Sequence, residues 1–257
     1  MSRVFDAYAK YYDLLYKSKN YKKETDYILK FIRKYKPDAK SILDLGCGTG
    51  RHDLLFSRKG FNTTGVEISE KMYTAAKEML NENKNEKISL KFYKGDIRKI
   101  KLLSKYDVIT SLFHVINYQT SNEDLDSVFK TVKSHLKKDG LFIFDFWYGP
   151  AVLSDRPEKR TKIMKNDDIE IKRHTVPEMK VNDNLAVINF KVEVKDLKTH
   201  RIKKFNETHN MRYLFLPEID SISEKFALEN IYTKEWLTGK NLSDKTWYGF
   251  TVLKNKN

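Results

Sequence analysis

The spacing of apolar residues follows a regular pattern from residue 22 to residue 146. Short apolar runs alternate with segments in which apolar residues recur every three to four positions. Such alternation is typical of the strands and connecting helices of a parallel α/β sheet. It predicts strands at 42–45, 61–68, 88–95, 106–112 and 141–146, and helices at 22–35, at 52–59, after Ser69 and from Ser121 to Gly140.

A different pattern follows Trp147. Between about Ile169 and Phe215, apolar and polar residues alternate with a period of two, and 182–184 and 196–199 have the composition of hairpin turns. We therefore expect an antiparallel β insertion directly after the fifth strand, serving as a lid, a substrate wall or the surface of a homodimer. A helix at 217–228 and strands at 230–237 and 246–253 are expected to complete the first sheet.

These patterns predict a doubly wound α/β fold in four parts. A chain of 257 residues is long enough to bury a sizeable core without disulfides. The parts are an N-terminal helical cap (1–36), a Rossmann-like core (37–149), the β insertion (150–212) and a C-terminal helix and hairpin that complete the core sheet (213–257).

The most informative stretch is Ser41–Gly50, in which an apolar run ends at regularly spaced glycines, among them Gly46 and Gly48. Glycine tolerates positive φ and close approach of a ligand to the backbone, so a strand, glycine turn and helix predict a nucleotide-binding unit. A dinucleotide loop, G-x-G-x-x-G, would need glycine where the chain has Arg51. The order acid-x-G-x-G-x-G, beginning at Asp44, resembles motif I of class I S-adenosylmethionine (SAM) methyltransferases. An ordinary tight turn and a divergent dinucleotide loop are the alternatives.

Acidic residues also occur at the ends of the next two predicted strands. Glu67 follows Asp44 by 23 residues, and an ionised carboxylate there can accept both hydroxyls of an adenosine ribose. This feature suits SAM and NAD equally and disfavours NADP, whose 2′-phosphate it would repel. Asp96 and Ile97 resemble the class I methyltransferase pattern, in which the acid binds the adenine amino group and the next backbone N–H a ring nitrogen. Without that context, Asp96 would more often be only a turn residue or a helix cap.

Apolar side chains near the same strand ends complete the predicted cofactor site. Ile68 and Met72 are expected on the two faces of the adenine. Leu112, the last residue of the fourth predicted strand, is expected to contact the cofactor as well.

The N-terminal segment is rich in tyrosine. Tyr-Asp-x-x-Tyr, at Tyr12 to Tyr16, resembles the opening of small-molecule methyltransferases. An aromatic face near a sulfonium ion gains about 0.5–2 kcal/mol. We expect Tyr12 and Tyr21 to contact the cofactor and Tyr16 the acceptor; alternatively, all three belong to a helix that only covers the core.

The segment after the fourth strand should face the ligand, because open α/β sheets bind ligands beyond the carboxyl ends of their strands. His114 and Tyr118 are candidates for orienting or deprotonating an acceptor, and Asn117 for binding it. The segment lacks the Asn/Asp-Pro-Pro-Tyr box of enzymes that methylate DNA amino groups, which weighs against a base as the acceptor. No histidine has metal-ligand spacing with a third partner, so no metal site is predicted.

Composition narrows the partners. The net charge of +14 brings nucleic acid into consideration, but the basic residues are mostly lysines spread along the whole chain, whereas phosphate-binding surfaces cluster them. The single cysteine, Cys47, excludes an internal disulfide and indicates a reducing compartment. With neither a signal-peptide pattern nor an apolar run of the ~18 residues that a membrane span requires, we expect a cytoplasmic protein.

Over Tyr8–Tyr21, 41–146 and the last 40 residues, the chain resembles the sugar-nucleotide amino N,N-dimethyltransferases. The resemblance implies a SAM-dependent methyltransferase acting on nitrogen or oxygen of a small molecule, above all a sugar or sugar nucleotide. In that family a histidine follows the fourth strand at the position of Tyr118, whereas this chain has His114 one turn earlier, so the acid/base assignment stays open. The alternatives are a tRNA or rRNA methyltransferase and a non-catalytic SAM-binding protein.

Overall fold

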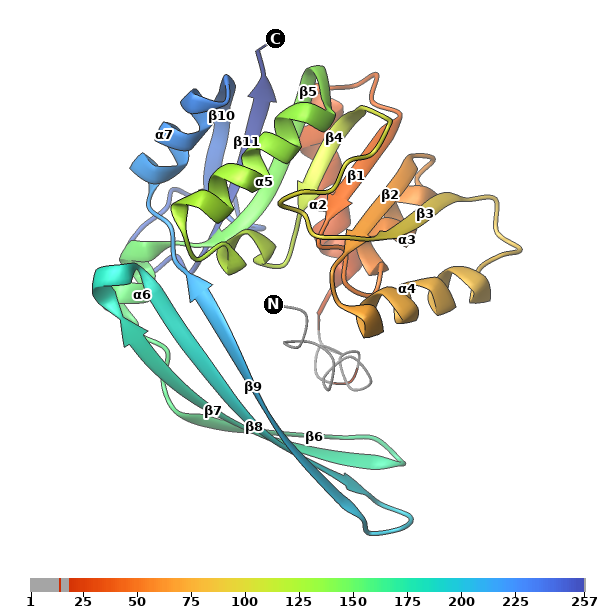
Figure 1. The fold of residues 1–257 in the computed structure, drawn as a ribbon, viewed down its shortest axis with the longest axis vertical. Helices are drawn as coiled ribbons and strands as arrows, with labels where there is room; N and C mark the ends of the chain where they lie inside the picture. Colours follow the sequence, from red (N-terminus) through yellow and green to blue (C-terminus); the bar gives the residue numbers. More distant parts are fainter. Residues whose placement is uncertain (1–13, 15–18, 257) are drawn as a thin grey trace.

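A computed structural model describes Leu14 and residues 19–256, and its main element is a seven-stranded sheet (Figure 1). The strand order is β10-β11-β5-β4-β1-β2-β3. The five strands from β1 to β5 run parallel, and β11 is antiparallel to both of its neighbours. The predicted doubly wound sheet with a closing hairpin is therefore confirmed. Its strands are β1 (Ser41–Leu45), β2 (Asn62–Glu67), β3 (Ser89–Lys94), β4 (Tyr106–Ser111), β5 (Leu136–Trp147), β10 (Leu228–Glu235) and β11 (Tyr248–Asn255).

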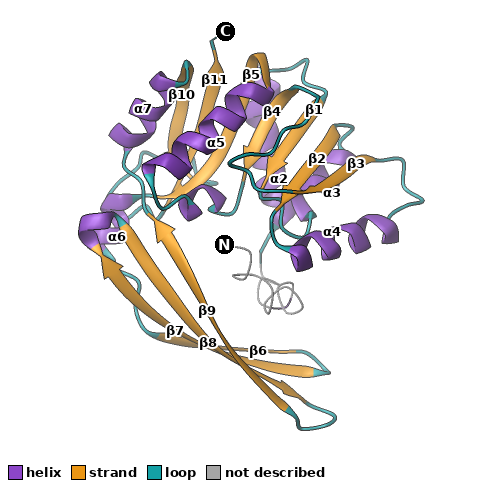
Figure 2. Cartoon of the chain, viewed as in Figure 1, coloured by secondary structure: helices purple, strands orange, loops and turns teal. Residues whose placement is uncertain are grey.

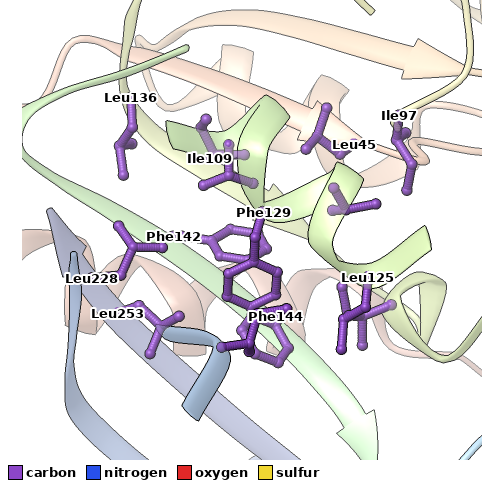
Figure 3. Close-up of a cluster of buried hydrophobic side chains, with 14 of the residues drawn as sticks. Leu45, Ile97, Ile109, Leu125, Phe129, Leu136, Phe142, Phe144, Leu228 and Leu253 are labelled. Carbon is purple, nitrogen blue, oxygen red and sulfur yellow. The ribbon is translucent and has the colours of Figure 1, made fainter. Parts of the chain in front are cut away.

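Helices pack on both faces of this sheet and bury two apolar layers. On one face, Phe129 packs against Phe142 and Phe144, with ring centroids 5.5 and 6.3 Å away (Figure 3). On the other face, Ile28 and Phe56 are fully buried against the sheet. Each such side chain contributes roughly 1.5–3 kcal/mol by leaving water. The helices are α2 (Tyr21–Tyr35), α3 (Arg51–Arg58), α4 (Glu70–Glu82), α5 (Asn122–His135), α6 (Gly149–Ser154) and α7 (Leu216–Lys225).

The boundary between α5 and β5 differs from the prediction. The sequence indicated a helix that ends at Gly140, but α5 ends at His135 and β5 begins at Leu136. Gly140 lies against the neighbouring strand: a Cβ there would come within 2.9 Å of the backbone oxygen of Asp107. The glycine therefore serves close strand packing beside a register shift between β4 and β5, not helix termination.

A second sheet, with the order β6-β7-β8-β9, is inserted between β5 and α7. It is antiparallel throughout, as predicted, and extends from α6 below the carboxyl ends of the parallel strands (Figures 1 and 2). The turns expected at 182–184 and 196–199 both occur. The prediction missed α6 and the edge strand β6. The strands are β6 (Arg160–Lys165), β7 (Ile169–Lys180), β8 (Leu185–Asp196) and β9 (Ile202–Arg212).

Asp107, on β4, holds the beginning of β1 in place. Its Oδ2 accepts hydrogen bonds from the backbone N–H groups of Lys40 and Ser41, both at 3.0 Å, and from the Ser41 hydroxyl at 2.7 Å. Its Oδ1 lies 2.9 Å from the Lys137 ammonium on β5. One carboxylate thus joins the starts of three adjacent strands.

Among the residues that the structure describes, no helix is long and apolar enough to cross a membrane.

Replacing Asp107 by asparagine should lower the free energy of unfolding by about 1–2 kcal/mol at pH 7. Burial opposes ionisation, but the Ser41 and Lys137 contacts outweigh it and lower the pKa of Asp107 from 3.8 to about 2. A lowered carboxyl pKa stabilises the fold above the unfolded value and loses that effect as pH falls towards 2. Urea unfolding at several pH values should therefore show the variant and the wild type converging between pH 4 and 2. The exposed Asp167→Asn variant is the control, and a pH-independent difference would contradict this account.

Candidate active site

A cavity of about 770 Å³ lies where the parallel strands end and the β insertion faces them. That volume is typical of small-molecule sites. The cavity brings together residues that are far apart in the sequence, from the ends of β1, β2 and β4 and from β7, β8 and β9. The predicted site residues that line it are Tyr21, Asp44, Gly46, Gly48, Glu67, Ile68, Met72, Asp96, Ile97, Leu112, His114 and Tyr118.

The three remaining predictions concern Tyr12, Tyr16 and Asn117. Tyr12 and Tyr16 lie outside the described residues. Asn117 is fully buried and does not line the cavity: its amide nitrogen donates to the carbonyl oxygen of Arg212, and its amide oxygen accepts from the backbone N–H of Trp147. The structure therefore gives Asn117 the task of joining β5 and β9, and does not place it where a substrate would bind.

The glycine turn after β1 leaves the backbone bare at the cavity. Gly46 has φ of +87°, and a Cβ there would come within 2.5 Å of Val115. Gly48 has φ of +58° with nothing within 4 Å of a Cβ position, so open space borders it. The backbone N–H of Gly48 points to Glu67 and donates to its Oε2 at 2.9 Å. A ligand can therefore approach the main chain closely at Gly48.

Glu67 lies at the end of β2 with both carboxylate oxygens held. Oε2 accepts from Gly48, and Oε1 accepts from the backbone N–H of Ser69 at 2.7 Å. Burial raises the pKa of Glu67, although these N–H groups oppose the shift. Each oxygen of an ionised carboxylate has two lone pairs, so a fixed Glu67 can still accept the hydroxyls of a ribose. Ser69 caps α4, as the sequence predicted.

Asp44 has an acidic partner that the sequence analysis missed. Its Oδ1 accepts from the Thr110 hydroxyl at 2.6 Å, and its side chain is hydrogen-bonded to Asp53 on α3. Burial raises the pKa of both carboxyls, and Asp44 raises that of Asp53 further. Two carboxyls buried in contact disfavour each other's ionisation.

Asp96 lies beyond β3 and is fixed by Arg98, which the sequence analysis also missed. The Arg98 guanidinium contacts both Asp96 oxygens, at distances from 2.6 to 3.1 Å, and reaches Asp124 on α5 at 2.6 Å. Burial opposes ionisation of Asp96, but Arg98 outweighs it and lowers the pKa. Asp96 is thus an oriented, ionised hydrogen-bond acceptor at the cavity. Its contact with an adenine amino group stays a prediction.

The segment after β4 presents His114 in an unusual backbone conformation. Phe113 and His114 have φ of +63° and +64°, and such left-handed non-glycine residues cost about 1–3 kcal/mol each. The Nδ1 of His114 lies 2.7 Å from Oδ2 of Asp145, and its backbone N–H donates to Oδ1. Burial opposes ionisation of Asp145, yet His114 and Lys19 lower its pKa. The His114 ring stacks on Tyr248 at 4.8 Å. Asp145 thus holds the segment through the His114 backbone N–H and lies directly against the imidazole.

The β insertion contributes its own polar groups to the cavity wall. The Tyr118 hydroxyl oxygen lies 2.6 Å from Nδ1 of His209, whose Nε2 lies 3.4 Å from Oε2 of Glu207. Burial and the nearby Arg173 lower the pKa of His209 to about 4, so the imidazole is neutral near pH 7. The sequence does contain a signal for these residues, because Arg173, Glu207 and His209 occupy buried positions in the alternation of β7 and β9 where apolar residues are expected.

Tyr21 is the one tyrosine of the predicted N-terminal set that the structure describes. It begins α2, lines the cavity and meets His52 edge-on, with ring centroids 5.0 Å apart. The Nε2 of His52 lies 2.8 Å from Oε2 of Glu24, and the Lys19 ammonium donates to Oε1 of the same carboxylate. The start of α2 is therefore tied to the glycine-turn helix beside the cavity. Among the described residues, no group of histidine, cysteine and acidic side chains is placed to hold a metal ion.

Comparisons with known proteins agree with this geometry. Residues 42–140 match the family model described as a methyltransferase domain. The chain is 31% identical over 150 residues to the dTDP-3-amino-3,4,6-trideoxy-alpha-D-glucopyranose N,N-dimethyltransferase of Streptomyces venezuelae, and this match covers 58% of the chain and 60% of the relative. It is 30% identical over 145 residues to the dTDP-3-amino-3,6-dideoxy-alpha-D-glucopyranose N,N-dimethyltransferase of Streptomyces fradiae, and this match covers 55% of the chain and 54% of the relative. The matches thus span less than two thirds of these relatives.

Solved structures match over nearly the whole chain. The crystal structure of Streptomyces venezuelae DesVI superposes with a TM-score of 0.77 and 26% identity, covering 95% of this chain and 97% of that one. SAM-bound CalS10, an amino pentose methyltransferase from Micromonospora echinaspora, superposes with a TM-score of 0.75 and 21% identity, covering 98% and 97%. The sheet order and the glycine turn with its acidic strand ends define a class I methyltransferase fold. Residues 42–140 carry a methyltransferase domain, and the fold is that of structures described as SAM-dependent methyltransferases.

The residues of the cavity fit SAM. Glu67 would hold the ribose, and the bare backbone at Gly48 would border the adenosyl group. Asp44, which lines the cavity, offers negative charge to the cationic part of the cofactor.

Replacing Glu67 by glutamine should weaken SAM binding roughly tenfold to hundredfold, because hydrogen bonds to a charged group contribute about 1.5–3 kcal/mol. Isothermal titration calorimetry measures the affinity directly. The exposed Glu82→Gln variant at the end of α4 is the matched control and should bind like the wild type. An unchanged affinity in Glu67→Gln, with the fold intact by circular dichroism, would rule out the ribose contact.

Proposed function

We propose that this protein transfers a methyl group from SAM to the amino nitrogen of a nucleotide-linked amino sugar. The observation that carries the proposal is the division of charge across one cavity. The wall formed by the core presents the acids Asp44, Glu67 and Asp96, and it also carries Arg51 and Arg98, of which Arg98 is paired with Asp96. Asp44 and Glu67, at the strand ends, suit a cationic cofactor. The wall formed by the insertion presents Arg173 and the 155–160 segment, whose side chains include three basic and two acidic groups.

A net positive wall opposite the cofactor suits an acceptor that carries phosphate, since arginine binds phosphate well. Two relatives are named for dTDP-amino sugars as substrates, and this charge distribution agrees with such an acceptor. The aromatic side chains of Phe190 and Trp147 also line the cavity and offer flat surfaces to a base or a sugar ring. An acceptor of this class would therefore find both charge and apolar surface on the insertion side.

The chemistry divides between cofactor and protein. SAM supplies an activated methyl group, which is the difficult part of the reaction. The chain holds the acceptor nitrogen in line with that methyl group, an effect worth up to roughly 7–11 kcal/mol. An amine attacks through its lone pair, so the ammonium form must lose a proton before it can react. His114, oriented by Asp145 at 2.7 Å, is the residue that we assign to accept this proton through Nε2.

Two further readings of the sequence have separate tests. An RNA methyltransferase would bind RNA with a steep salt dependence. A non-catalytic SAM-binding protein would bind SAM and transfer the methyl group to none of the acceptors offered.

Assembly of two copies through the β insertion stays a prediction. Light scattering of the purified protein would test it, by comparison with a variant that carries lysine at the exposed Ile163 of β6.

The purified protein should methylate a nucleotide-linked amino sugar and leave its hydroxyl counterpart unchanged. The test incubates labelled SAM with four acceptors: a dTDP-amino sugar, the same dTDP-sugar with a hydroxyl in place of the amine, the free amino sugar, and tRNA. Mass spectrometry then detects the added methyl groups. Transfer to tRNA or only to the hydroxyl compound would refute the proposal, and a preference for the free sugar would refute the phosphate-binding part.

Replacing His114 by glutamine should lower kcat on the amino sugar about 10²–10⁴-fold, because it removes the group that accepts the proton. SAM affinity should change little, since the cofactor is held by the residues of the core. The exposed His200→Gln variant in the turn between β8 and β9 is the control. Raising the pH should partly restore the His114→Gln rate, because more of the amine is then unprotonated in solution. A rate equal to the wild type would remove His114 from the mechanism.

A further inference from the structure

The β insertion brings a second histidine to the cavity, and it differs from His114 in kind. His209, on β9, is 4% exposed, with Nδ1 2.6 Å from the Tyr118 hydroxyl and Nε2 3.4 Å from Glu207. The Phe190 ring packs against the His209 imidazole in a T-shaped contact, with ring centroids 5.0 Å apart. The buried guanidinium of Arg173 lies over the same Phe190 ring, 4.7 Å from its centroid. Within the part of the chain that the structure describes, the groups that face His209 include a carboxyl, a guanidinium, a phenol and an aromatic ring.

The direction of the hydrogen bonds follows from these partners. When Glu207 is ionised it can only accept, and Nε2 of His209 then carries the ring proton and donates to it. A neutral imidazole with its proton on Nε2 accepts at Nδ1. The Tyr118 hydroxyl therefore donates its proton to His209, and its oxygen can only accept from a ligand. The positive charge of Arg173 strengthens this arrangement, because it disfavours a second proton on the imidazole.

An oxygen that only accepts is what an attacking amine requires. A donor at that place would bind the nitrogen lone pair and hold it away from the methyl group. An acceptor instead binds an N–H and leaves the lone pair available. Arg173 also disfavours the ammonium form of an amine bound nearby, which is the form that cannot attack.

We infer that His209 and Glu207 are positioning residues that hold Tyr118 as a hydrogen-bond acceptor for the N–H of the acceptor amine. The inference rests on the proposed function and adds a rule for the acceptor: it must carry at least one N–H. Primary and secondary amines meet that rule, and a tertiary amine does not. Transfer should therefore stop when the nitrogen has lost its last hydrogen.

The test compares four variants on the amine that the wild type methylates: Tyr118→Phe, His209→Leu, His209→Asn and the double variant Tyr118→Phe with His209→Leu. His209→Asn keeps an oxygen acceptor near the position of Nδ1, whereas leucine removes it. Tyr118→Phe and His209→Leu should each lower kcat roughly tenfold to hundredfold, with little change in SAM affinity. His209→Asn should retain most of the rate. The double variant should be no slower than Tyr118→Phe, because His209 acts through the tyrosine.

A purely structural histidine would give additive losses, and it would give equal damage from leucine and asparagine; either result would overturn the inference. Thermal unfolding of each variant identifies those that fail to fold, and His209→Asn serves in place of any that do. A tertiary amine sugar that is methylated at the wild-type rate would also contradict the N–H rule.

A measurement without any acceptor separates this inference from the proposed function. The ¹⁵N spectrum of the His209 ring should show the neutral form with its proton on Nε2 down to about pH 5 in the SAM-bound protein. Tyr118→Phe should change the Nδ1 resonance and leave the tautomer intact. A proton on Nδ1 would overturn the inference, whatever the acceptor proves to be. Failure of every amine in the acceptor panel, with the expected tautomer, would instead count against the proposed function alone.

Discussion

The cavity depends on negative charge that the fold buries at the ends of neighbouring strands. Asp44, Glu67 and Asp145 lie at or near the carboxyl ends of parallel strands, and a parallel sheet brings these ends to one edge. Burying a carboxylate is costly, and each is compensated differently. Backbone N–H groups bind Glu67, His114 faces Asp145, and the Thr110 hydroxyl binds Asp44. The concentration of buried acids at this edge favours a cationic ligand such as SAM.

The core of the fold could be predicted because its signals are local. The glycine turn, the acids at the strand ends and the amphipathic helices each occupy a short stretch whose spacing decides its structure. The misses have equally physical causes. Gly140 indicated a helix end, but its missing side chain serves the packing against Asp107. Strand β6 is an edge strand with little apolar surface, and only Ile163 and Met164 interrupt its polar residues. A strand that buries almost nothing leaves almost no pattern in a sequence.

The site could be predicted on the cofactor side and only in part on the acceptor side. Asp44 and Glu67 are found by counting along the chain, whereas the contact between Tyr118 and His209 joins residues 91 positions apart. Asn117 shows the opposite error, since a polar residue beside the site was assigned to a ligand and instead holds two backbone segments together. The sequence did contain one indication of the cavity residues on the insertion: charged side chains occupy positions of β7 and β9 where the alternation predicts buried apolar residues. Reading them as functional requires knowing that the strand faces a cavity, which is tertiary information.

The two histidines illustrate why a cavity of this kind needs both the core and the insertion. His114 lies beside a buried carboxylate, and the proposed function gives it the task of proton exchange. Burial and the nearby Arg173 favour the neutral form of His209 and limit it to hydrogen bonding. Under the proposed function, the segment after β4 would carry proton transfer, and the β insertion, the part of the chain whose pattern differs most from that of the core, would position the acceptor.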